Sequence, residues 1–292
     1  MKFPFSVGQY LRDPTPKYPP PPHPQEPILT QLYSTNPNPQ PPPKPPLPAP
    51  FNTNTWLWIE WTFLYILVPP LIAALTKPHL AADLLTRLDL NFISFDTGLP
   101  SAVFIFPLLL FTFTTMLIYL RKDPTFDNRI LWNLQDLKAA LPRILTTFAF
   151  AAPIILFASW YLAHHTPLLP ESGFLRLPRE IPLLLLAITI FYPWISAYPQ
   201  EITHRAFFFH RYAPILGSSH TILILNILTF SWLHITMWNP IALIMTLPAG
   251  IIFALTYRRT NSALAAGFEH AIFGIFAFAA GLGYFVFAGA VN

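Results

Sequence analysis

The chain has 292 residues, of which 53% are hydrophobic and 10% are charged, with a formal net charge of +4. Several apolar stretches of membrane-spanning length carry almost no charge, so we expect an integral membrane protein with little room for a separate soluble domain. The sequence contains no cysteine. This excludes disulfides and thiolate sites, and nothing in the composition supports binding to nucleic acid.

The first region, residues 1–50, contains eighteen of the 35 prolines. Proline has no backbone N–H to give to a helix or sheet, so this segment is predicted to be disordered or polyproline II. We interpret it as an extended tail, with a ligand for a proline-binding domain as the alternative. Its amino terminus lacks the continuous apolar segment of a signal peptide.

The remaining sequence predicts an all-α, polytopic membrane bundle of seven to eight spans. Residues 51–180 are expected to hold the N-terminal membrane helices and an amphipathic linker, and residues 181–292 a catalytic core. Spans are predicted at 56–76, 99–120, 143–163, 181–212, 220–235, 240–257 and from 262 onward, with a short eighth piece before Asn292.

The linker at 121–143 is basic, and its stretch ILWNLQDLKAAL has the mixed spacing of an interfacial amphipathic helix. By the positive-inside rule we expect this linker to be cytoplasmic. Alternation of the spans then puts the proline-rich tail on the cytoplasmic side, and the loops at 77–98, 164–180 and 236–240 on the other side.

The segment YPQEITHRAFFFHRY, residues 198–212, is unusually rich in ionisable groups for this apolar core. At about 1.5 Å of rise per residue, Glu201 lies about 16 Å from the predicted cytoplasmic turn, His234 about 21 Å and His270 about 12 Å. Each ionisable side chain costs about 2.5 kcal/mol or more within a membrane unless it faces an interior site. Three of them at similar depth on three helices therefore predict a shared polar site.

Local spacing supports this interpretation. Glu201 and Arg205 are four residues apart and share a helix face, as do Phe230 and His234. Small residues at 263, 267 and 271 form a stripe that lets a neighbouring helix approach closely. The alternatives are a structural ion pair between Glu201 and Arg205, and hydrogen-bonded structural histidines at 234 and 270.

The order of QEITHR, FSWLH and EHAIFG, with IIFALTYRRTNS before the third motif, resembles the type II CAAX prenyl endopeptidase and bacteriocin-processing family of intramembrane proteases, also called CPBP or Abi. The family motifs are a Glu-Glu pair with an arginine beyond three intervening residues, Phe-x-x-x-His, and His followed four residues later by Asn. The resemblance covers about residues 183–283. It points to Glu201, Arg205, His234 and His270 as the site.

The chain departs from the family pattern at two places. Gln200 replaces the first carboxylate of the pair, and an amide cannot act as a general base. A subgroup of the family reads Tyr-Pro-Gln-Glu here, which makes Glu201 the working carboxylate. In the third motif Gly274 stands at the Asn position and Ile275 follows it, so an oxyanion contact would have to come from elsewhere, such as Asn226 or Asn239.

The resemblance implies hydrolysis of a membrane-associated or prenylated peptide near its carboxyl end. Glu201 and His234 would activate water, and His270 would assist by stabilising the oxyanion. Glu201, His234 and His270 are also a chemically suitable ligand set for a divalent metal such as zinc, and the family is described both with and without metal. The motifs further suggest a multi-pass protein of a bacterial inner membrane, surrounded by lipid.

Two other functional classes stay open. The departures at Gln200 and Ile275 are compatible with a catalytically inactive family member that serves as a membrane scaffold or immunity protein. Intramembrane Glu, His and Arg side chains also build relays in proton-coupled transporters. Paired inverted repeats would favour a transporter, and the two halves of this sequence show no convincing similarity.

Overall fold

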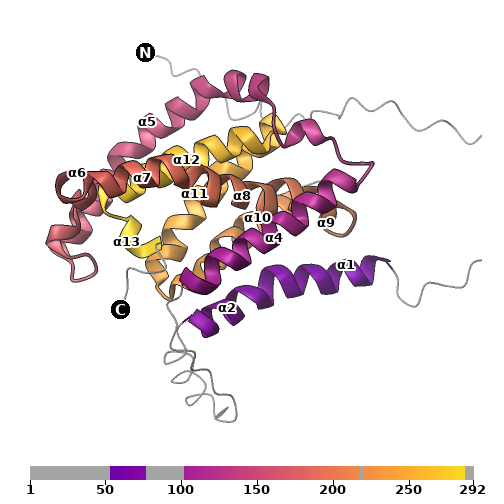
Figure 1. Ribbon diagram of the computed structural model, residues 1–292, viewed down its shortest axis with the longest axis horizontal. Helices are drawn as coiled ribbons and strands as arrows, with labels where there is room; N and C mark the ends of the chain where they lie inside the picture. Colours follow the sequence, from indigo (N-terminus) through magenta and orange to yellow (C-terminus); the bar gives the residue numbers. More distant parts are fainter. Residues whose placement is uncertain (1–52, 77–101, 218–219, 287–292) are drawn as a thin grey trace, which may run out of the picture. The chain divides into compact units, whose positions relative to one another are not determined.

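The computed structural model describes residues 53–76, 102–217 and 220–286, and the regular elements in these ranges are all helices (Figure 1). The predicted all-α membrane bundle is confirmed. Six described helices are long and apolar enough to cross a membrane. The proline-rich tail, the loop at 77–98 and the final residues up to Asn292 lie outside the described residues.

The α-helices follow the predicted order of spans, and α4 occupies the position of the second one. They are α1 (Thr53–Trp61), α2 (Val68–Thr76), α4 (Ala102–Lys122), α5 (Leu134–His165), α6 (Arg176–Glu180), α7 (Pro182–Tyr192), α8 (Tyr198–Glu201), α9 (Phe208–Leu216), α10 (His220–Leu233), α11 (Pro240–Thr260), α12 (Ala263–Ala280) and α13 (Gly283–Val286).

Helix α5 differs from the expected separate interfacial helix in the linker. It runs without a break from Leu134 to His165, so the second part of ILWNLQDLKAAL forms its first turns. The Asn133 side chain caps it by accepting hydrogen bonds from the backbone N–H groups of Gln135 and Asp136. This cap satisfies N–H groups that have no partner within the helix and fixes the start of the helix here.

Helices α7, α8 and α9 form one continuous apolar span, Pro182–Leu216, which is interrupted by two π-helical segments. These segments are Pro193–Ala197 and Ile202–Phe207. Proline lacks the N–H of the regular helical hydrogen bond, and a wider turn is one way to accommodate that loss. The helix therefore forms a π-helical turn at Pro193, and Glu201 lies between the two wide segments.

Helix α12 is the most buried of the candidate spans, with 56% of its apolar window inside the protein compared with 11% for α5. It contacts α5, α8 and α11. A left-handed turn at Asn261 ends α11, and the Ser262 hydroxyl then caps α12 by accepting from the N–H of Ala265. This tight connection places α12 antiparallel to α11, with its third-motif histidine inside the bundle.

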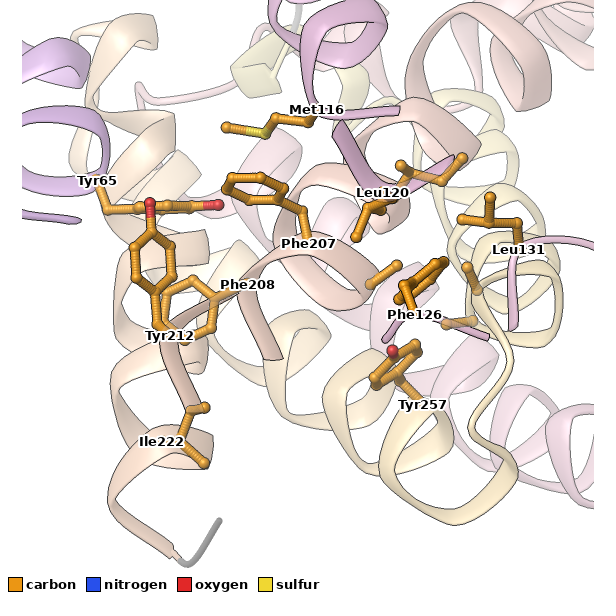
Figure 2. Close-up of a cluster of buried hydrophobic side chains, with 14 of the residues drawn as sticks. Tyr65, Met116, Leu120, Phe126, Leu131, Phe207, Phe208, Tyr212, Ile222 and Tyr257 are labelled. Carbon is orange, nitrogen blue, oxygen red and sulfur yellow. The ribbon is translucent and has the colours of Figure 1, made fainter. Parts of the chain in front are cut away.

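A large aromatic and aliphatic core joins α9 to the N-terminal helices (Figure 2). The Tyr65 ring meets Phe208 and Tyr212 edge to face, with centroid distances of 4.9 and 5.7 Å. Beside it, Glu60 receives hydrogen bonds from Arg211 at 2.6 and 3.0 Å and from the Tyr212 hydroxyl at 3.0 Å. These contacts fix α1 against α9.

The loop after α4 is tied to the same end of α9. Asp123 accepts hydrogen bonds from the Thr125 hydroxyl at 2.6 Å and from its N–H at 2.9 Å, and contacts His210 Nε2 at 2.9 Å. The Thr125 hydroxyl, followed by His210, holds the pKa of Asp123 well below its usual range. His210 and Arg211 thus pair with carboxylates of the protein.

Candidate active site

The structure brings Glu201 and His270 into direct contact at the centre of the bundle. Glu201 is the last residue of α8 and His270 lies midway along α12. His270 Nδ1 is 2.9 Å from Glu201 Oε1, and the Glu201 side chain is fully buried. A carboxylate at Nδ1 holds the proton on that nitrogen and sets the orientation of the ring.

Arg205 neutralises the charge of this pair. Its Nε lies 3.2 Å from Glu201 Oε2, and both side chains are completely buried. The guanidinium also lies over the ring of Phe230, 4.6 Å from its centroid. A buried carboxylate needs such a partner because an unpaired charge in an apolar interior is strongly unfavourable. The spacing of four residues between the two side chains, noted in the sequence, thus forms an ion pair.

The His270 ring is held in place by aromatic neighbours. It stacks on Phe253 with a centroid distance of 4.6 Å and an interplanar angle of 17°, and meets Phe230 edge to face at 5.7 Å. With Nδ1 engaged by Glu201, Nε2 is the nitrogen that remains for a ligand.

His234 is the first residue of the 3₁₀ turn His234–Met237, which follows α10. Its Nδ1 contacts the backbone carbonyl of Phe230 at 2.9 Å, one helical turn earlier. The Phe230 ring lies edge to face with His234 at 5.3 Å and also contacts His270 and Arg205. The Phe-x-x-x-His spacing therefore places one aromatic ring against all of these groups.

Two cavities meet at His234 and Gln200. The larger, of about 530 Å³, is lined by His234, Gln200 and His270 and continues along α7 between apolar residues such as Leu184 and Ile188. The smaller, of about 150 Å³, lies towards α2 and is also lined by His234 and Gln200. Two imidazoles therefore face the larger cavity, which is otherwise mostly apolar.

The pairing of the predicted residues differs from the sequence-based expectation. Glu201 was expected to work with His234, but its carboxylate contacts His270 and Arg205, and no hydrogen bond joins it to His234 in the described chain. Glu201 also does not line either cavity. His270, which contacts Glu201, does line the larger cavity.

The geometry does not support a metal centre at these residues. Across the described ranges, no group of three His, Asp or Glu side chains is arranged to hold a metal ion. Both oxygens of Glu201 already have partners in His270 and Arg205. Glu201, His234 and His270 therefore do not form the ligand set that their residue types suggested.

Sequence reasoning missed Tyr192, which lines the larger cavity and meets His270 edge to face at 6.1 Å. Two signals could have indicated it. Tyr192, Ser196 and Gln200 recur every four residues in an apolar stretch, and Gly274 stands where the family pattern has a polar residue. Both become informative only when α7 and α12 are seen to be neighbours.

Comparison with known proteins supports the resemblance drawn from the motifs. Residues 180–276 match the family described as Type II CAAX prenyl endopeptidase Rce1-like. Neither the comparison with curated proteins nor that with solved structures found a match. The matched region contains all three motifs and the contact between Glu201 and His270. Residues 180–276 are thus similar in sequence to the Rce1-like type II CAAX prenyl endopeptidases.

Proposed function

We propose that this protein is an intramembrane endopeptidase that cleaves lipid-modified peptides of the CAAX type near their carboxyl end. One observation carries the proposal. A cavity of about 530 Å³ is lined by His234 and His270, and His270 Nδ1 is hydrogen-bonded to the buried Glu201. A carboxylate-bound imidazole facing an apolar cavity is an arrangement suited to proton transfer.

In the proposed reaction, His270 Nε2 takes a proton from a water molecule as the water oxygen attacks the carbonyl carbon of the scissile bond. Glu201, hydrogen-bonded to Nδ1, stabilises the positive charge that the imidazole gains. The same proton then passes to the leaving amine, so the C–N bond breaks and a free carboxylate and amine result. His234 faces the same cavity and would orient the water or the carbonyl group.

Arg205 belongs to the site without touching substrate in this scheme. Its ion pair with one oxygen of Glu201 compensates the buried charge, while the other oxygen contacts His270 Nδ1 and orients the ring. The scheme revises the sequence-based roles. His270 becomes the base, and Glu201 orients its ring.

The larger cavity suits a peptide attached to an apolar chain. Its wall along α7 includes Leu184, Ile188 and Phe191, while polar groups concentrate near His270. Prenylated CAAX peptides combine these two characters, since a long hydrocarbon is attached to a cysteine close to the chain end.

We also propose that the protein resides in a bacterial inner membrane with its amino terminus in the cytoplasm.

The test is cleavage of a fluorogenic farnesylated CAAX peptide by the purified protein in liposomes. We expect Glu201→Gln, His234→Ala and His270→Ala each to lower kcat by about 10²- to 10⁴-fold, the usual contribution of a proton-transferring group. His165→Ala, at the exposed end of α5, is the matched control and should cleave as the wild type does.

The alternatives predict other outcomes of the same experiment. A wild-type protein that folds and binds the peptide but does not cleave it would identify an inactive scaffold or immunity protein. Proton flux across the liposome membrane without cleavage would identify a transporter. Unchanged rates in the three histidine and glutamate variants would contradict the proposed site even if the wild type cleaves.

A further inference from the structure

The α12 position that carries a polar residue in the family pattern is a glycine here, and a tyrosine from another helix fills the space. A Cβ atom on Gly274 would lie 2.5 Å from both the hydroxyl oxygen and the Cε1 atom of Tyr192. No side chain fits at that distance unless the tyrosine moves. The absence of a side chain at 274 is therefore what admits the Tyr192 ring beside α12.

Tyr192 presents its ring to the reacting region. It is the last residue of α7, directly before the π-helical turn Pro193–Ala197. Its ring meets His270 edge to face at 6.1 Å and Phe278 at 5.6 Å, with interplanar angles of 72° and 71°. It lines the larger cavity together with His270 and His234. The Tyr192 ring thus lies beside the imidazole of the proposed base, and its hydroxyl lies against Gly274.

Polar neighbours on the same helix face extend this arrangement. Ser196 lies four residues beyond Tyr192 on the same continuous span. Gln200, one turn further, donates from Nε2 to Ser196 Oγ at 2.9 Å. All three residues line the larger cavity. They form a polar row on an otherwise apolar wall, and Tyr192 is its member in ring contact with His270.

The two asparagines that the sequence offered as oxyanion donors are engaged elsewhere. The Asn226 side-chain amide donates to the backbone carbonyl of His204. Asn239 donates to the carbonyl of Phe285 at 2.7 Å, and its Oδ1 caps α11 by accepting from Ala242. Neither lines the larger cavity. Their amides satisfy backbone groups, so the donor for a substrate carbonyl must come from another residue.

We propose that the Tyr192 hydroxyl is this donor. As water attacks, negative charge develops on the carbonyl oxygen of the substrate, and the phenolic O–H donates a hydrogen bond to it. A donor preorganised in an apolar cavity stabilises this charge more than water does. The Tyr192 ring occupies the space beside Gly274. From α7 it supplies the hydrogen bond that a polar side chain at position 274 of α12 would otherwise donate. The inference rests on the proposed peptidase function.

The first test is Tyr192→Phe, which removes the hydroxyl and keeps the ring. We expect kcat for the farnesylated CAAX peptide to fall about 10²- to 10³-fold with little change in KM, as for loss of one oxyanion donor. Tm should stay within a few degrees of the wild type. Tyr161→Phe, an exposed tyrosine on α5, is the control. A kcat equal to that of the wild type would overturn the proposal.

The second test moves the donor back to α12. Tyr192→Ala vacates the space beside Gly274, and Tyr192→Ala/Gly274→Asn places an amide there. We expect the double variant to have a kcat about tenfold or more above that of Tyr192→Ala. This gain corresponds to partial recovery of the rate that one oxyanion donor contributes. Equal rates in two folded variants would contradict a shared role for the two positions.

A binding experiment separates this inference from the peptidase proposal. A phosphinate peptide carries a tetrahedral, negatively charged group in place of the scissile amide, so it mimics the oxyanion. The wild type should bind it more tightly than the matched amide peptide, and Tyr192→Phe should lose that preference. This preference without turnover would support Tyr192 as a hydrogen-bond donor to a tetrahedral anion while refuting the peptidase proposal. A wild type without the preference would refute the role of Tyr192.

Discussion

At the scale of single residues, the site depends on a buried carboxylate with two partners. Glu201 contacts His270 through one oxygen and Arg205 through the other, and its side chain has no exposed surface. Breaking one side of a buried ion pair is costly because the remaining charge has lost both water and partner. The stability of the core and the chemistry of the site therefore depend on the same contacts.

This coupling predicts the outcome of removing the arginine. Arg205→Met should lower the free energy of unfolding by about 3–5 kcal/mol, since it leaves the Glu201 charge buried with one partner fewer. Arg205→Met combined with Glu201→Gln should be less destabilised than the sum of the two single variants. Thermal or denaturant unfolding in detergent measures both effects. Additive losses would mean that the two charges do not interact.

The interior location of the candidate site residues could be predicted from sequence, but the pairing among them could not. Glu201, His234 and His270 stood out because ionisable groups at one depth of a membrane bundle need an interior location. Which histidine meets the carboxylate depends on helix rotation, and the π-helical turns on either side of Glu201 change that rotation. Depth follows from counting residues, whereas rotation does not.

At the scale of helices, close approach between α12 and α8 sets the position of His270. Small residues at 263, 267 and 271 predicted such an approach, and the structure confirms it at Gly267. A Cβ there would lie 3.0 Å from the Tyr198 ring and 3.4 Å from the Tyr198 Cα. Because α8 carries Glu201 and α12 carries His270, the separation of the two helices controls the contact between the two side chains.

Filling this contact should therefore affect both folding and activity. Gly267→Leu is expected to lower stability by about 1–3 kcal/mol, the usual cost of overpacking, and to reduce cleavage more than Gly267→Ala does. Gly217→Ala is a useful comparison because no atom lies near its Cβ position, although its positive φ adds some strain. If Gly267→Leu kept full stability and activity, close helix packing would not be what positions His270.

The linker at 121–143 illustrates a limit of periodicity at this scale. Its mixed apolar and polar spacing is compatible with a surface helix, but the same spacing also fits the first turns of a longer one. Capping by Asn133 makes Leu134 the start of α5, and Ile144, two to three turns later, is fully buried. Tertiary packing decides where such a helix ends, and a local pattern contains no such information.

At the scale of the whole molecule, the distribution of basic residues predicts the orientation in the membrane. Arg121 and Lys122 end α4, and Arg258 and Arg259 lie in the last turn of α11. By the positive-inside rule these ends should face the cytoplasm, and the loop between α5 and α6 should face the other side.

The chain contains no cysteine, so single-cysteine labelling can test this orientation without a background signal. A thiol at Arg129→Cys should react with a membrane-impermeant maleimide only after the inner surface is exposed. A thiol at Glu171→Cys should react from the outer surface of intact cells. The opposite pattern would reverse the orientation and put the proline-rich tail outside.

The continuous span from Pro182 to Leu216 has 35 residues. At about 1.5 Å per residue it is about 50 Å long, whereas the hydrocarbon part of a bilayer is about 30 Å thick. A helix of that length has to lie obliquely or project into the headgroups, and its tilt adjusts to the lipids around it. Because Glu201 and Tyr192 both belong to this helix, the acyl-chain length of the host membrane becomes a physical variable of the proposed reaction.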